Sequence, residues 1–149
     1  MSTMESSKSL WAVVLFMLGV SLMLAFQESE SGPQTPEIRA QVVTSAAELK
    51  SMESVDLPFP GVEMLCIQAP HLSKGELERS ANRDIEDFKR MGADTQFRLH
   101  VFSRDGKHEQ LLFDDKLTRI NYAQLRRPCE KTDSIHLERR DEFVLVSLP

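Results

Sequence analysis

The longest apolar stretch of the chain lies near its N-terminus. Residues 10–26 carry no charge, and only Gly19 and Ser21 interrupt the apolar side chains. Residues 9–26 would extend about 27 Å as a helix at 1.5 Å per residue, which is close to the thickness of a bilayer's hydrocarbon core. We therefore expect residues 1–26 to be a signal-anchor that forms a transmembrane helix, or a signal peptide that is removed.

The charges that flank this stretch predict its orientation. Lys8 precedes it, whereas Glu28 and Glu30 follow it, so the N-terminus is expected on the cytoplasmic side. Ala25 is small enough for a cleavage site, but Met23 two residues before it is too large for the usual pattern. The sequence thus favours an uncleaved single-pass anchor with an extracytoplasmic domain, periplasmic or extracellular. Secretion after cleavage is the alternative.

A polar stretch separates this segment from the rest of the chain. Residues 27–36 are acidic, rich in Ser, Gly and Pro, and lack apolar side chains that could anchor them in a core. This composition is typical of a flexible linker. The remaining residues, 37–149, are enough for one modest hydrophobic core and are expected to form the extracytoplasmic domain.

The first part of this domain predicts two strands and a short helix. Residues 40–43 favour a strand, and Ser45 with Glu48 fits the capping box that begins a helix. Residues 55–61 contain two prolines and cannot be helical. Residues 62–69 are almost continuously apolar, which is typical of a strand that is covered on both faces.

A second capping box predicts the longest helix. Ser73 and Glu76 have the spacing of this motif, and Gly92 is placed to end a helix that begins there. The apolar side chains between them recur three or four residues apart, as on one face of a helix: Leu77, Ala81, Ile85, Phe88 and Met91.

Two hairpins and a further helix complete the pattern. Residues 95–104 alternate between polar and apolar, and Asp105-Gly106 predicts a tight turn into a return strand at 108–113. Apolar spacing before Pro128 favours a short third helix, and residues 134–148 favour a closing hairpin. The order predicts a single small α/β or α+β domain with one mixed sheet of about five or six strands and two or three helices.

This order of elements resembles the thioredoxin fold over roughly half of the domain. The residues do not carry the redox chemistry of that family, because no C-x-x-C pair stands at the start of the predicted long helix. The resemblance therefore implies a redox-inactive thioredoxin-like domain. Its site would lie around Pro70 and Ser73 (residues 70–73), at the N-terminus of that helix.

Composition and the number of cysteines exclude several classes of protein. The 149 residues carry a formal charge of −5, which argues against a nucleic-acid binder. Cys66 and Cys129 are too few for a disulfide-rich scaffold or a four-cysteine zinc site. Export favours a disulfide between them. The alternative is a buried free Cys66 and an exposed Cys129.

The histidines and paired carboxylates give no recognisable catalytic or metal site. His108 and Glu109 start a zinc-protease motif, but Leu112 stands where the second histidine is needed. His100 and His108 can approach each other across the hairpin, yet two ligands do not complete a structural zinc site. Asp114 and Asp115 are expected to cap the following element. No cofactor or metal is expected.

The remaining candidates concern binding. Residues 143–148 are uncharged and strongly β-forming, so Phe143 and Leu145 are expected to bind a partner if this is an edge strand; a central strand is the alternative. Arg126 and Arg127 form a basic patch, or else a solvated face. The sequence favours a membrane-tethered, non-catalytic protein-binding or assembly module whose partner is another envelope or membrane protein. The alternative is a small exported enzyme, or the redox-inactive thioredoxin-like domain, with its site at residues 70–73.

Overall fold

A computed structural model describes residues 35–149 except residue 93. These residues fall within one compact unit. The described part contains two α-helices, α2 (Thr35–Glu48) and α3 (Lys74–Ala81), and the short 3-10 helix η1 (Tyr122–Arg126). Its strands are β1 (Ser54–Pro58), β2 (Val62–Gln68), β3 (Phe97–Ser103), β4 (His108–Phe113), β5 (Thr118–Ile120), β6 (Cys129–Glu130), β7 (Ser134–Arg139) and β8 (Val144–Ser147).

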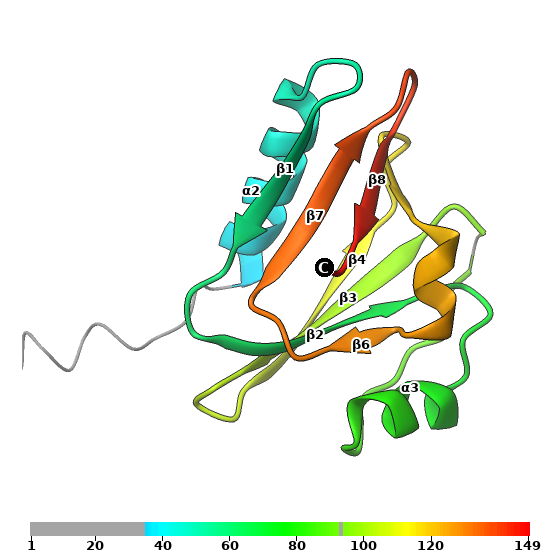
Figure 1. Ribbon diagram of the computed structural model, residues 1–149. Coiled ribbons are helices and arrows are strands. Elements are labelled where there is room, and N and C mark those ends of the chain that lie inside the picture. The colour runs from blue at the N-terminus through cyan, green and yellow to red at the C-terminus, as the bar shows by residue number, and fades with distance from the viewer. Residues whose placement is uncertain (1–34, 93) are drawn as a thin grey trace, which may run out of the picture. The chain divides into compact units, whose positions relative to one another are not determined.

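The strands form two four-stranded sheets (Figure 1). One has the order β1-β7-β8-β5, with a parallel pair between β5 and β8 and antiparallel pairs elsewhere. The other has the order β4-β3-β2-β6 and is antiparallel throughout. The domain is therefore α+β, and its eight strands lie in two sheets rather than in the single sheet that the sequence predicts. This topology also differs from the thioredoxin-like arrangement.

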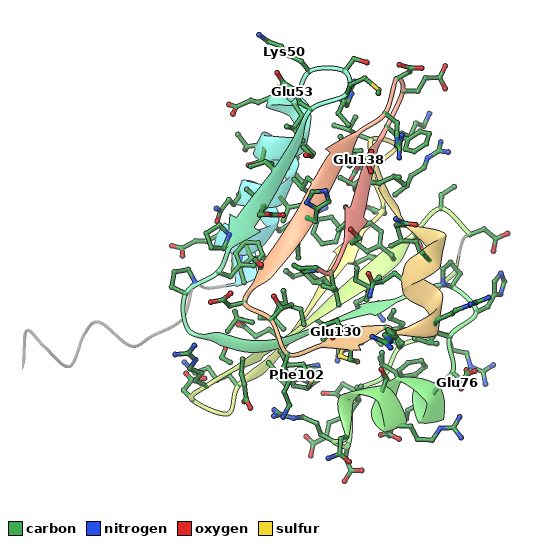
Figure 2. The ribbon with its side chains drawn as sticks, in the orientation of Figure 1. Lys50, Glu53, Glu76, Phe102, Glu130 and Glu138 are labelled. Carbon is green, nitrogen blue, oxygen red and sulfur yellow. A yellow bond between two sulfur atoms is a disulfide. The ribbon has the colours of Figure 1, made fainter. Side chains whose placement is uncertain are left out.

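The outer face of the β4-β3-β2-β6 sheet is covered by α3 and by the residues that follow it. Met64, Cys66 and Phe102 project from this face and form a second hydrophobic cluster with Leu77 and Ala81 of α3. Figure 2 shows Phe102 on the side of the sheet where Glu76 and the rest of α3 lie. Strand β2 is thus covered on both faces, as its nearly continuous apolar sequence predicts.

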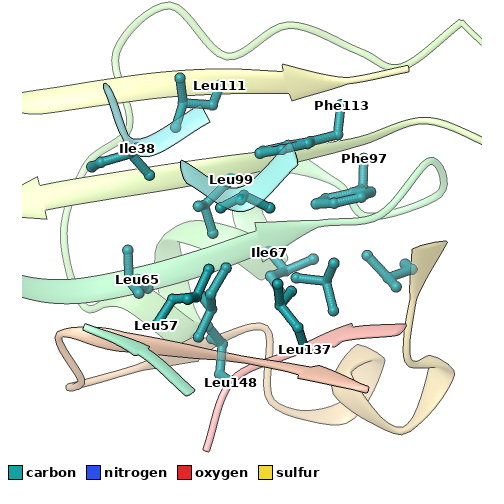
Figure 3. Close-up of a cluster of buried hydrophobic side chains, with 14 of the residues drawn as sticks. Ile38, Leu57, Leu65, Ile67, Phe97, Leu99, Leu111, Phe113, Leu137 and Leu148 are labelled. Carbon is teal, nitrogen blue, oxygen red and sulfur yellow. The ribbon is translucent and has the colours of Figure 1, made fainter. Parts of the chain in front are cut away.

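The main core lies between the two sheets and includes one face of α2 (Figure 3). Strands β2, β3 and β4 contribute side chains from one side, whereas β1, β7 and β8 contribute from the other. The rings of Phe97 and Phe113 stack with centroids 4.8 Å apart. Helix α2 contacts β4, and Ile38, Val42 and Ala46 are fully buried on its inner face.

The predicted strand at residues 40–43 is wrong, because this stretch lies within α2. Ser45 and Glu48 end that helix rather than begin one. Val42 and Val43 have β-branched side chains that favour a strand, but burial of a stripe with four-residue spacing outweighs this weak preference.

The predicted helix over residues 74–91 is much shorter in the structure. Its capping box is confirmed: the Ser73 hydroxyl accepts from the Glu76 amide, and the Glu76 carboxylate accepts from the Ser73 amide. The helix ends at Ala81, and Asn82 caps it in the left-handed conformation. A carboxylate oxygen of Glu78 then accepts from the Ile85 amide at 2.9 Å. Gly92 therefore does not cap this helix.

Both predicted hairpins are confirmed, and the third predicted helix is not. Strands β3 and β4 pair around the Asp105-Gly106 turn, where Gly106 has a φ of +84°, and β7 pairs with β8. Residues 117–125 form β5 and η1 instead of an α-helix. The predicted anchor and most of the predicted linker lie outside the described residues. Among residues 35–149 without residue 93, no helix is long and apolar enough to span a membrane.

Candidate functional site

A cleft of about 590 Å³ lies next to the edge strand β5 and its neighbour β8 in the β1-β7-β8-β5 sheet. Strands β5 and β8, the loop before β8 and the residues that lead into β3 form its walls. Its lining residues are Asp94, Thr95, Gln96, Phe97, Arg119, Ile120, Arg140, Asp141, Glu142, Phe143 and Leu145. More than a third of them are apolar or aromatic, so the cleft can take up an apolar side chain as well as polar groups.

Arg119 is the cation best placed to meet a ligand in this cleft. Its guanidinium lies over the Phe143 ring, 4.8 Å from the centroid, which is a cation–π geometry. No carboxylate in the described part of the chain forms an ion pair with it. By contrast, Arg140 at the rim is held by Glu138 at 2.8 Å. A negative group that enters the cleft would therefore meet an oriented guanidinium that is not already neutralised.

A second cleft of about 380 Å³ continues from the first near the N-terminus of α3. Both clefts share Asp94 and Ile120, and the second also includes Pro70, His71 and Glu76. His71 lies 3.3 Å from Asp94, but their side chains are 88% and 86% exposed. The hydrogen bond from the Ser73 hydroxyl, followed by the one from the Ser73 amide, lowers the pKa of Glu76. These groups are therefore solvated or occupied in capping, and none is buried as a tuned catalytic group usually is.

The structure separates the predicted partner-binding residues. Strand β8 is central, between β7 and β5, so residues 143–148 follow the central-strand alternative and present no open edge to a partner. Phe143 and Leu145 nevertheless line the first cleft through their side chains. Arg126 and Arg127 are exposed at the end of η1 and are not among the residues that line the cleft.

The predicted disulfide between Cys66 and Cys129 is confirmed. The two cysteines lie directly opposite each other in the antiparallel pair of β2 and β6. Both are buried beneath α3, and no free cysteine is found in the described part of the chain. The bond therefore joins the short edge strand β6 to the centre of its sheet.

The hairpin brings His100 and His108 together, as the sequence predicts, but in a buried network that it did not predict. His100 Nδ1 lies 3.0 Å from His108 Nε2, and His100 Nε2 lies 2.9 Å from Gln68 Oε1. His100 is fully buried and His108 is half-buried. Burial, then the charges of His108 and Arg98, lower the pKa of His100 to about 3. Gln68 within an otherwise apolar strand was the available signal of this network.

The paired carboxylates have structural roles. Asp115 accepts hydrogen bonds from the Leu117 amide and from the amide and hydroxyl of Thr118, which fixes the turn into β5. Asp114 lies 3.6 Å from Arg39 of α2. In the described ranges, 35–92 and 94–149, no group of three or more His, Cys, Asp and Glu side chains is arranged to hold a metal ion.

A polar row that the sequence did not predict lies on the outer face of the β1-β7-β8-β5 sheet. Asp56, His136 and Ser147 are direct neighbours across three strands, and Asp56 Oδ1 lies 2.6 Å from His136 Nδ1. Within the described residues no hydrogen bond joins Ser147 to His136, and the backbone groups of β8 are engaged in pairing with β7. The row therefore fits an exposed ion pair better than a hydrolytic site.

No protein-family model, curated protein or solved structure matches this chain.

Proposed function

We propose that this protein is a membrane-tethered binding module whose domain lies on the extracytoplasmic side and holds another envelope or membrane protein. The uncharged residues 10–26, the polar stretch 27–36 and the buried Cys66–Cys129 disulfide support this location. The observation that carries the binding role is the first cleft, where Arg119 lies over Phe143. Arg126 and Arg127 remain a proposed accessory contact for an acidic surface.

The cleft fits a peptide segment that carries an apolar side chain next to a carboxylate. Phe143 and Leu145 are half-buried and offer apolar surface, while Arg119 offers a charge-assisted hydrogen bond to the carboxylate. Asp141 and Glu142 at the rim can accept from the backbone N–H groups of the same segment. Either a C-terminus or an internal Asp or Glu supplies the carboxylate.

Site-specific photo-crosslinking in intact membranes tests this role. A photoreactive side chain at position 143 should give one discrete adduct, because a bound partner lies directly against the cleft. Arg119→Gln should remove the adduct, whereas Arg104→Gln, in the exposed turn of the other sheet, should leave it unchanged. Equal adduct yields in the two variants would contradict a role for the cleft.

The second cleft supports a different candidate, a small exported enzyme with its site at residues 70–73. His71 would then be the catalytic acid or base, and Asp94 would orient it. This candidate predicts that His71→Ala abolishes a turnover activity without changing crosslinking from position 143. The binding module predicts that His71→Ala alters the adduct yield by no more than about twofold, because the His71 side chain is exposed and does not line the first cleft.

A further inference from the structure

Strand β5 lies at the edge of its sheet and, in the described part of the chain, pairs only with β8. Backbone groups of β8 bond to the Leu117 carbonyl at 2.8 Å and to the Asn121 amide at 3.0 Å. Because backbone groups along a strand point alternately to its two sides, those of Arg119 also face β8. The backbone groups of Thr118 and Ile120 therefore face the free edge of the sheet.

Three of these backbone groups remain without a partner from the sheet. The Thr118 amide donates to Asp115 at 2.6 Å, which leaves the Thr118 carbonyl and the amide and carbonyl of Ile120. Within residues 35–92 and 94–149, neither the β5–β8 ladder nor the other backbone hydrogen bonds engages them. An edge with free N–H and C=O groups is a template for the backbone of a further strand.

The first cleft reaches around this edge from both faces of the sheet. The Ile120 side chain belongs to the main core, so it lies on the inner face. Side chains alternate along a strand, and the exposed Arg119 therefore lies on the outer face. Both residues line the cleft, together with Phe97 of the main core and Leu145, which is paired with Arg119. The cleft thus occupies the position that an additional strand beside β5 would take.

The two faces of this edge determine the side chains that an added strand needs. A residue placed opposite Arg119 meets a guanidinium that is already oriented over the Phe143 ring, so a carboxylate suits this position. Its two neighbours point to the inner face, toward Phe97 and Ile120, where apolar side chains fit. Ile120 also lines the second cleft, so the path along β5 continues beyond the first. An internal Asp or Glu fits this path better than a chain end.

We propose that the partner segment binds the first cleft as an added strand along the free edge of β5. This inference rests on the proposed function, since it describes how the partner occupies that cleft. The occupant is an extended, internal segment of the partner in which an Asp or Glu stands between two β-branched apolar residues. Strand β5 has only three residues, Thr118–Ile120, so backbone hydrogen bonds alone are too few to recruit any strand, and Arg119 supplies the selectivity.

A synthetic pentapeptide, Thr-Val-Glu-Val-Thr, tests the proposal directly. A fluorophore blocks its N-terminus and an amide blocks its C-terminus, so the Glu side chain is its only carboxylate. Fluorescence anisotropy with the full chain in a mild detergent should show saturable binding below about 1 mM. Replacing Glu by Gln in the peptide should weaken binding at least about tenfold, because the charge-assisted bond to Arg119 is lost.

Methylation of single backbone nitrogens of the peptide tests strand addition itself. Every second amide of an added strand faces β5, and the intervening amides face away. Methylation at the alternate positions should therefore weaken binding at least about tenfold, whereas methylation between them should change it less than about threefold. The sensitive set reports whether the strand adds parallel or antiparallel to β5, and either set supports the proposal.

Two variants of the protein complete the test. Arg119→Gln should weaken binding of the peptide at least about tenfold and should bind the Glu and Gln peptides equally. Arg104→Gln, in the exposed turn of the other sheet, should bind like the wild type. Circular dichroism and an intact disulfide establish that both variants are folded.

Four results would overturn strand addition. They are no saturable binding, equal sensitivity to methylation at every position, binding that does not depend on Arg119, and a dimer of the full chain that the peptide dissociates. The last result would place a second copy of this chain on the edge. If the crosslink from position 143 depends on Arg119 while the peptide shows no alternation, only strand addition is wrong. If the peptide shows alternation but membranes give no crosslink, only the proposed membrane partner is wrong.

Discussion

The buried disulfide gives the prediction with the most definite magnitude. Replacing both cysteines by alanine removes the bond without leaving a reactive thiol. The bond spans a sequence separation of 63, so it closes a loop of 64 residues, counting both cysteines. In the chain-entropy model, the bond lowers the entropy of the denatured state by about 14 cal/mol/K. Removing the bond should therefore cost about 4 kcal/mol of unfolding free energy at 25 °C. That is a large part of the stability of a domain of this size.

Urea denaturation of the full chain in a mild detergent, followed by far-ultraviolet circular dichroism, measures this effect. The variant should lose about 4 kcal/mol of unfolding free energy, and its m-value should rise because an uncrosslinked denatured chain exposes more surface. Wild-type protein under reducing conditions should show the same loss. Ser54→Ala, on the exposed edge strand β1, serves as the control and should change stability by less than about 0.5 kcal/mol.

A loss below about 1 kcal/mol in both the variant and the reduced wild type would refute this reasoning. It would mean that the β2–β6 pairing holds without the covalent bond and that the bond does not restrict the denatured chain. A large loss in the variant alone would instead indicate damaged packing of Cys66 and Cys129 beneath α3.

Further predictions concern single residues and use the same denaturation assay. Ser73→Ala should cost about 1 kcal/mol because it removes the confirmed cap of α3, whereas Ser80→Ala on the exposed face should be nearly neutral; equal costs would contradict the capping role. Ile38→Ala should cost about 2–5 kcal/mol because the side chain is fully buried, and a cost below 1 would place α2 outside the core. Gly106→Ala should cost about 1 kcal/mol from backbone strain alone, because no atom lies within 4 Å of the added Cβ; a neutral result would contradict the positive φ.

Local signals predicted the elements of this fold well only where nearby residues determine the structure. The turn at Asp105-Gly106 and the capping box of Ser73 and Glu76 depend on contacts within a few residues, and both are present. The helical spacing beyond Ala81 was misleading. Ile85 and Phe88 lie in an irregular segment and pack against the sheet, and Gln68 and Arg98 both donate to the Lys89 carbonyl of that segment from strands outside it.

The same distinction applies to the candidate site. Phe143 and Leu145 were identified from β-propensity and apolar character, but strand order decides whether their backbone or their side chains meet a partner, and no local pattern reveals that order. Arg119 was not identified at all, because its significance depends on Phe143 across the parallel β5–β8 pair. The disulfide was predictable because a chain with two cysteines has a single possible intramolecular pairing.

The central claim is that this domain functions outside the cytoplasm while tethered to a membrane. A reporter enzyme that is active only outside the cytoplasm, fused after Pro149, measures the location directly when its activity is followed in the membrane fraction. The account predicts an active reporter that sediments with membranes and resists extraction by high salt. A reporter that is active only in its cytosolic form would contradict the account.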